Sequence, residues 1–294
     1  RHHVDIRVIN LHGDTIYGEV KRIVFENTPK YWKQLNLHIR TIAKTNDAIH
    51  RLLGVGIAFP GEVSADRDYV IRSTVLGVKN LSIAEIQKHF SYPVYVEYGA
   101  NAAGFGTVWR SKELKDAVYV IVTNNGVAGS IILNNEIYHG RTGRAGAFGH
   151  ITLNPSGRKC FCGACGCWSA YNALNALTGL DETDLDGFFE KVNNEDPDAI
   201  AKWDEYLTYF ADGLSTVSMS FDIDIVIDGP LAVYLEPWLD TIISKMQSRP
   251  TLNGENISIH LDTKSESPMA EGVALMIVAK FLNDELDNFR FDEL

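Results

Sequence analysis

The stretch "GHITLNPSGRKCFCGACGCWSA", residues 149–170, carries the strongest indication of the fold in this sequence. It contains all four cysteines of the 294-residue chain, and His150 lies ten residues before the first of them. A disulfide framework usually spreads its cysteines along a secreted chain. The clustering therefore favours a metal site over a disulfide, a redox pair or a set of buried free thiols.

Three thiolates and one imidazole are the ligands of a common kind of tetrahedral zinc site. Gly163 and Gly166 allow backbone turns with positive φ, which let ligands so close in sequence converge on one ion. Because four protein ligands leave no open position on the metal, we expect a structural Zn²⁺ rather than a catalytic one. The predicted ligands are His150, Cys160, Cys162 and Cys167, with Cys165 left over or substituting for a neighbour.

The overall composition is that of a globular protein, with 45% hydrophobic and 22% charged residues. No apolar run approaches the roughly 20 residues that cross a bilayer, and the start has no signal-peptide pattern. We therefore expect a cytoplasmic protein without membrane contact. The net charge is -11 and no Lys/Arg cluster is present, so these residues are poorly suited to binding nucleic acid by themselves.

Alternating segments of strand and helix character predict an α/β protein. Apolar and polar residues alternate on both sides of Gly13, which predicts a hairpin over residues 4–25. Residues 93–109 are typical of a strand that runs into a helix of small residues. Further strands are expected within 52–63, 117–140, 223–230 and 257–262. We expect two α/β lobes: residues 1–112 with a closing helix at 268–294, and residues 113–267 with the zinc site.

The cysteine-rich stretch resembles the signature of the ROK family, which comprises sugar kinases and sugar-responsive repressors. That signature is Gly-His, a spacer and then Cys-x-Cys-Gly-x-x-Gly-Cys-x-Glu; this chain differs in having Ser169 at the final glutamate. Residues 54–63, 93–103 and 124–150 also resemble family segments. The resemblance implies an actin-like, sugar-kinase-type fold of two ribonuclease H-like lobes, with structural zinc bracing the sugar pocket.

The residue that acts as base in the family's kinases is missing at the matching position. A sugar kinase needs a carboxylate that takes the proton from the attacking hydroxyl. The family supplies it as the Asp of Glu-Asn-Asp-x-Asn, where this chain has Gly99. Glu97 lies two positions away on the same strand face and at a different place, so it is a poor replacement.

The phosphate-binding loops of the family are also incomplete. No Asp-x-Gly-Gly-Thr motif occurs, and the start of this chain matches the family's second strand. The family's Gly-Thr-Gly reads Asn124-Asn125-Gly126, and the nucleotide-side Gly-Gly reads Gly229-Pro230, which removes a backbone N–H. We therefore predict that this chain is not an enzyme.

The sugar contacts implied by the resemblance are altered as well. Ala147 and Ser169 stand where the family has glutamates, and Tyr98 stands where it has asparagine. We expect a ligand cleft between the lobes, with altered chemistry, that binds a sugar or sugar derivative. The alternative is that the pocket binds no ligand. The predicted ligand-binding residues are Gly61, Asn80, Tyr98, Gly99, Asn101, Ala147, His150 and Ser169.

The favoured function is the effector-binding and oligomerisation region of a ROK-type transcriptional repressor. DNA contact is expected through a helix-turn-helix upstream of Arg1, and a homodimer or homotetramer is expected. One alternative is a divergent sugar kinase that uses Glu97 as its base. A second is a catalytically dead relative that acts as a scaffold or binding protein. The sequence upstream of Arg1 would distinguish the three.

Overall fold

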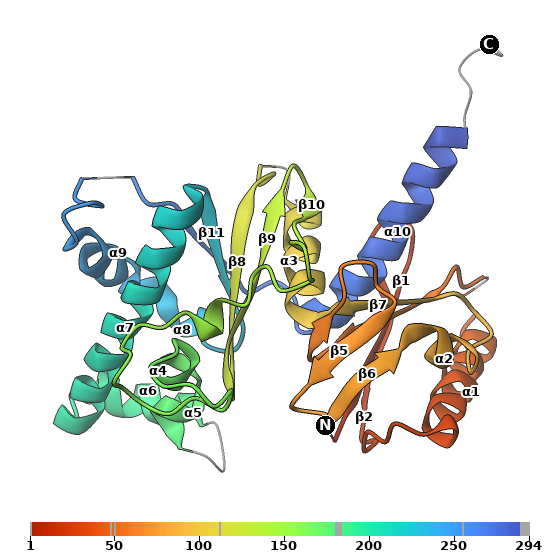
Figure 1. Cartoon of the computed structure of the whole chain (residues 1–294), viewed down its shortest axis with the longest axis horizontal. Coiled ribbons are helices and arrows are strands. Elements are labelled where there is room, and N and C mark those ends of the chain that lie inside the picture. Colours follow the sequence, from red (N-terminus) through yellow and green to blue (C-terminus); the bar gives the residue numbers. More distant parts are fainter. Residues whose placement is uncertain are drawn as a thin grey trace. The chain divides into compact units, whose positions relative to one another are not determined.

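The computed structural model describes residues 2–47, 49, 51–111, 113–179, 184–254 and 256–288, which form two compact units (Figure 1). Unit 1 consists of the described residues within Arg1–Lys112, His139–Ala145 and Ser265–Leu294. Unit 2 consists of those within Glu113–Tyr138 and Gly146–Lys264. No helix in the described part of the chain is long and apolar enough to cross a membrane.

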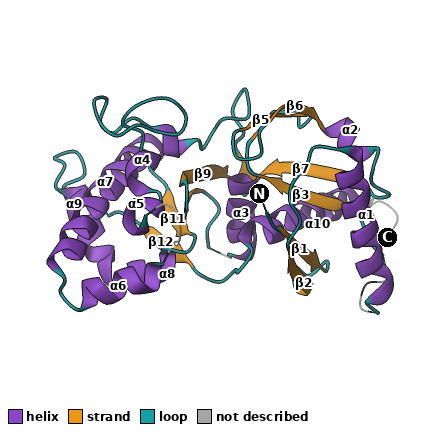
Figure 2. Ribbon diagram, turned by 90° about the horizontal axis from the view of Figure 1, so that it is seen from below, coloured by secondary structure: helices purple, strands orange, loops and turns teal. Residues whose placement is uncertain are grey.

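Unit 1 contains three small sheets (Figure 2). The predicted hairpin is confirmed as β1 (Val4–Ile9) and β2 (Thr15–Lys21), which pair antiparallel around a turn in which Gly13 has a φ of 91°. The other strands are β3 (Val55–Phe59) parallel to β7 (Val94–Tyr98), and an antiparallel sheet of β4 (Glu62–Val63), β5 (Tyr69–Ser73) and β6 (Val78–Ser82).

The helices of unit 1 are α1 (Pro29–Thr45), α2 (Ile83–Gln87), α3 (Gly99–Arg110) and α10 (Pro268–Asn288). Helix α10 packs against α3 and also contacts β1 and β3. The two helices approach closely because glycines lie at their crossing: a Cβ on Gly272 would lie 1.8 Å from the carbonyl oxygen of Ala102. This approach makes α10 part of the core of unit 1 although it is distant in sequence.

Unit 2 is built on a five-stranded mixed sheet in the order β10-β9-β8-β11-β12. Strands β8, β9 and β10 form an antiparallel meander, whereas β11 is parallel to both β8 and β12. The side chains of β8 are almost all buried, as expected for a central strand covered on both faces. The bounds are β8 (Ala117–Thr123), β9 (Gly126–Leu133), β10 (Glu136–Ile137), β11 (Asp224–Asp228) and β12 (Ile259–Asp262).

The longest helix of unit 2 is α7 (Pro197–Phe221), which begins at an Asp196 cap whose side chain accepts the N–H of Ala199 at 2.9 Å. A Cβ on its Gly213 would lie 2.1 Å from the ring of Trp168, so the fully buried indole packs on the helix backbone. The remaining helices are η1 (Phe148–His150), α4 (Ser169–Asn172), α5 (Asn175–Thr178), α6 (Leu185–Asn193), α8 (Ala232–Leu235), η2 (Glu236–Trp238) and α9 (Leu239–Gln247).

Candidate functional site

The four predicted metal ligands form one cluster in unit 2. The side-chain nitrogen or sulfur atoms of His150, Cys160, Cys162 and Cys167 all lie within 4.8 Å of one another. Cys162 Sγ is 3.7 Å from Cys167 Sγ, and Cys160 Sγ is 3.8 Å from His150 Nδ1. Two thiolates bound at about 2.3 Å to a tetrahedral ion lie about 3.8 Å apart, so the group could bind a metal ion.

The backbone of the cysteine loop brings these atoms together through tight turns. Gly163 and Gly166 have φ values of 96° and 75°, as predicted from their places between the cysteines. A Cβ on Gly166 would lie 1.6 Å from the carbonyl oxygen of Asn154, so only glycine fits there. Cys165 is exposed and does not belong to the cluster.

The thiols of the cluster have unequal pKa values. Burial, with hydrogen bonds to Cys162 and Cys160, raises the pKa of Cys167 to about 12. Burial also acts on Cys162, but hydrogen bonds from the backbone at Ala164 and from neighbouring thiols outweigh it and lower the pKa. A metal ion bound here would have to displace the protons of these thiols.

The predicted ligand-binding residues of unit 2 lie close in sequence to the four clustered residues but differ in solvent exposure. Ala147 and His150 are exposed, on either side of the buried Phe148 and Gly149. Ser169 is only 3% exposed, and its Oγ accepts the N–H of Val127 at 3.0 Å and lies 3.3 Å from the Val127 carbonyl oxygen. The Ser169 hydroxyl is therefore engaged with the backbone of β9.

Unit 1 contains the other predicted ligand residues. Gly61 packs against β5, where a Cβ would lie 2.5 Å from the Arg72 carbonyl oxygen. Asn80 is exposed and has a φ of 50°. Tyr98 is half-buried, and burial, with a smaller effect of the Glu62 charge, raises the pKa of its phenol to about 12. The Tyr98 hydroxyl therefore stays neutral at physiological pH.

Gly99 begins helix α3 beside the side chain of Met269. A Cβ at this position would lie 2.9 Å from the Sδ atom of Met269 on α10. A longer acidic side chain would need Met269 to move. The resemblance to the family identifies Gly99 at the position of the base, but it does not predict the contact with Met269.

Glu97, 1% exposed, is the centre of a buried polar cluster in unit 1. Its Oε1 accepts the side-chain amide of Asn101 at 2.9 Å and the N–H of Tyr98 at 2.9 Å. Its Oε2 lies 3.1 Å from Arg67 Nε and 2.9 Å from His139 Nε2. Burial alone would raise the pKa of Glu97, but the contacts with His139 and Asn101 outweigh burial and lower it.

No sequence pattern points to two members of this cluster. Arg67 and His139 lie 30 and 42 residues from Glu97 along the chain. Arg67 adopts a positive φ of 60° in the turn between β4 and β5, which is unusual for arginine. An asparagine or aspartate at this position would have suggested that conformation, whereas arginine does not.

The segments that match the family's phosphate loops have backbone groups that are already paired. The carbonyl oxygens of Thr123 and Asn124 accept the N–H groups of Leu174 and Asn175, at 3.0 and 3.2 Å. The N–H of Gly229 donates to the carboxylate of Asp228, and Pro230 has no N–H. Neither residue of the Gly229-Pro230 pair therefore offers an uncommitted backbone N–H to an anionic ligand.

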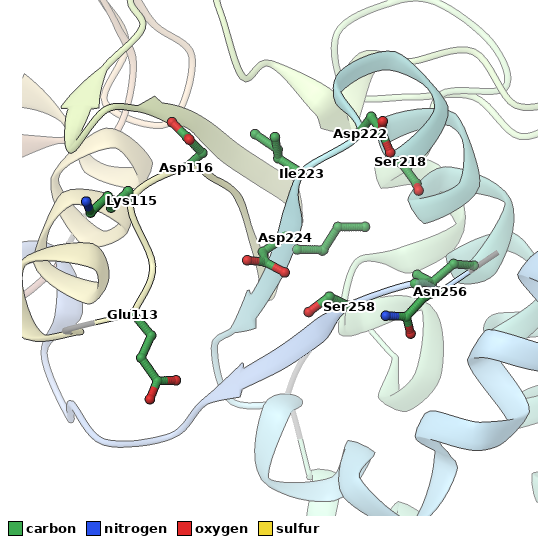
Figure 3. Close-up of a pocket in the computed structure, with 11 residues that line it drawn as sticks. Glu113, Lys115, Asp116, Ser218, Asp222, Ile223, Asp224, Asn256 and Ser258 are labelled. Atoms are coloured by element: carbon green, nitrogen blue, oxygen red, sulfur yellow. The ribbon is translucent and has the colours of Figure 1, made fainter.

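A separate pocket of about 470 Å³ lies in unit 2, at the start of β8 and β11 and beside the end of α7 (Figure 3). Acidic side chains dominate its wall, with Lys115 as a basic neighbour. None of the predicted metal or sugar ligands lines it. The lining residues are Glu113, Lys115, Asp116, Ser218, Asp222, Ile223, Asp224, Ile225, Asn256, Ile257 and Ser258.

Comparison with known proteins finds both regulators and kinases. A xylose repressor of Caldicellulosiruptor bescii is 29% identical over 166 residues, which are 55% of this chain and 41% of the repressor. A glucokinase of Halalkalibacterium halodurans is 31% identical over 115 residues, 38% of this chain and 35% of the enzyme. The matched regions thus cover less than half the length of these curated relatives.

The fold has solved counterparts. The crystal structure of a ROK family transcriptional regulator, a homologue of the E. coli MLC protein, superimposes with a TM-score of 0.79 at 20% identity, covering 95% of this chain and 79% of the regulator. The predicted actin-like α/β fold of this group is therefore confirmed. The model of the ROK family matches residues 1–270. The cysteine signature, the fold and this match over nearly the whole chain agree, and the chain belongs to the ROK family.

Proposed function

We propose that this chain is the effector-binding and oligomerisation region of a ROK-family transcriptional repressor and does not phosphorylate sugars. The observation that carries the proposal is Gly99, at the position of the kinase base. It has no side chain to accept a proton, and Met269 fills the space beside it. Two further losses support the proposal: Gly229 donates its N–H to Asp228, and Pro230 has none.

The repressor function requires a DNA-binding element that the described residues do not include. We infer a helix-turn-helix in a segment preceding Arg1 of a longer polypeptide, acting in a cytoplasmic homodimer or homotetramer. In this scheme effector binding changes the population of two conformations, and the change alters the spacing of paired DNA-binding modules. The similarity to a xylose repressor supports this role.

The metal of this repressor is proposed to be one structural Zn²⁺ held by His150, Cys160, Cys162 and Cys167. Four protein ligands at these mutual distances leave no position for a substrate. When bound, the ion would fix the loop that carries His150. We infer the same lobes as from the sequence, 1–112 with 268–294 and 113–267, except that His139–Ala145 pack with the first of them.

The effector is proposed to be a sugar or sugar derivative. The proposed site lacks the two glutamates that pair with sugar hydroxyls in the family's kinases, since Ala147 and Ser169 stand at those positions. Each missing charge-assisted hydrogen bond is worth about 1.5 to 3 kcal/mol. Because two glutamates are missing, unmodified glucose should bind at least roughly a hundredfold more weakly than it would to a site that has both. The residues concerned are Gly61, Asn80, Tyr98, Gly99, Asn101, Ala147, His150 and Ser169.

A divergent sugar kinase is the second candidate, supported by the glucokinase relative. Its base would be Glu97. That carboxylate already has four hydrogen-bond or ion-pair contacts, is 1% exposed and has a lowered pKa. A group so engaged is a weak proton acceptor. A non-catalytic scaffold or binding protein is the third candidate, and it would make no contact with DNA.

One set of measurements separates the repressor from the kinase. Coupled ATP-consumption assays with hexoses and amino sugars should stay at background. Calorimetric titration with glucose, xylose, N-acetylglucosamine and their phosphates should find a ligand other than glucose. ATP turnover that Glu97→Gln abolishes would establish the kinase instead, and micromolar glucose binding would show that the effector site has been assigned to the wrong residues.

A further inference from the structure

The segment His139–Ala145, here called the strap, belongs to unit 1, whereas its sequence neighbours on both sides belong to unit 2. It leaves unit 2 after Tyr138 and returns at Gly146. Contacts with unit 1 must therefore hold the strap in its place, because neither end continues into that unit.

Two carboxylates of unit 1 bind the strap, one near each end. Glu97 contacts His139 of the strap and also Arg67. The Glu62 carboxylate accepts hydrogen bonds from Arg144 Nε of the strap at 2.8 Å and from an Arg72 guanidinium nitrogen of β5 at 2.7 Å. Each carboxylate thus bridges one basic side chain of the strap and one from the β4–β5 region.

The two ends differ in burial. Glu97 is 1% exposed and lies beneath the His139 end. At the other end Glu62 is 27% and Arg144 is 57% exposed, so water and salt reach this ion pair. Exposed ion pairs contribute little and are screened by salt, whereas a buried charge that loses its partner is costly.

The middle of the strap rests directly on the backbone of unit 1. Gly143 has a φ of 77°, and a Cβ there would lie 2.0 Å from the carbonyl oxygen of Val63. A side chain at this position would push the strap away from β4. The contact is therefore steric and independent of charge.

We propose that the strap is a latch fixed at His139 and releasable at Arg144. The buried Glu97 holds the first end. The partly exposed Glu62 holds the second through an ion pair for which solvent ions can compete. The releasable end leads through Gly146 to His150, five residues beyond Ala145. The chain between the strap and His150 is itself packed on β9, where a Cβ on Gly146 would lie 2.5 Å from the Gly129 carbonyl oxygen, so opening of the latch is confined to the strap. The proposal does not depend on the identity of the effector or on DNA binding.

Hydrogen exchange of the strap peptide, followed by mass spectrometry on the whole chain without effector, tests the latch. Glu62→Gln should speed exchange about threefold to tenfold in low salt, and about 1 M NaCl should bring the unmodified protein close to that rate. Glu97→Gln should speed exchange at least about tenfold at either salt concentration. Gly143→Ala should release the strap without changing any charge.

Matched controls are available within unit 1. Glu85→Gln removes an exposed ion pair with Lys88, away from the strap. Gly77→Ala replaces another glycine of positive φ, 68°, where a Cβ would meet no atom within 4 Å. Neither should change exchange of the strap. Unchanged exchange in Glu62→Gln, or an equal increase in either control, would overturn the proposal.

Trypsin gives an independent readout, since the strap contains Arg141 and Arg144. Cleavage after Arg144 should accelerate in Glu62→Gln more than cleavage after other exposed arginines. Uniform acceleration at all sites would indicate general unfolding and contradict a local latch.

Discussion

The metal cluster of unit 2 and the Glu97 cluster of unit 1 are both sets of polar side chains that converge on one point, yet they are built in opposite ways. The metal cluster draws its four members from residues 150–167, through glycine turns within one loop. The Glu97 cluster draws Arg67, Asn101 and His139 from separate elements. The first depends on local backbone geometry, and the second on the tertiary fold and a buried charge.

The largest effect should follow from removing a metal ligand. Cys167→Ser or Cys162→Ser should abolish binding of the expected single zinc equivalent and lower the melting temperature by more than about 10 °C, because zinc binding is coupled to folding of the loop. Elemental analysis and thermal melting are the measurements. Cys165→Ser is the matched control and should keep the metal; equal losses in both variants would refute the ligand assignment.

Loss of the Glu97 carboxylate should have the next largest effect. Glu97→Ala leaves Arg67 and His139 without their shared partner, which should lower the free energy of unfolding by about 3 kcal/mol in urea titrations. Glu205→Ala removes an exposed pair with Arg158 and should cost less than about 1 kcal/mol. A Glu97 effect as small as this control would show that the buried cluster is not an integral part of unit 1.

The contribution of Glu97 to the stability of unit 1 should depend on pH. Because the folded-state pKa of Glu97 is lowered, its contribution is complete above the ordinary carboxyl value of 4.5 and is lost as the pH falls through the lower folded value. The stability difference between the unmodified protein and Glu97→Gln should therefore be constant near neutrality and shrink below about pH 4.5. A difference that grows on acidification would contradict the sign of this shift.

The smallest effect should come from the pair Gly99 and Met269, which contact each other in unit 1. Gly99→Asp should destabilise unit 1 because its side chain meets the Met269 sulfur. Met269→Ala in the same chain should recover about 1 kcal/mol relative to the sum of the single changes, as measured by a double-mutant cycle. Strict additivity would mean that the methionine does not restrict position 99.

The same contrast explains what can be predicted from the sequence. The hairpin around Gly13 follows from a local pattern and is confirmed. The sequence clustering of His150 and the cysteines corresponds to a group that could bind a metal, and their role as ligands stays a prediction. The contacts of Arg67 and His139 with Glu97 depend on which elements the fold brings together. The engagement of Ser169 with Val127 and the packing of Met269 beside Gly99 are of the same kind. Composition and periodicity do not encode such long-range partners.

Helix α10 has a consequence for the order of events during synthesis. Its Gly272 fits against Ala102 of α3, so unit 1 gains this packing partner only after the ribosome has passed residue 272. All of unit 2 precedes Ser265 in the sequence, so it is synthesised before Gly272. Unit 2 can therefore fold while the residues of unit 1 that precede it still lack α10, and nascent unit 1 would be the portion that most needs chaperone protection.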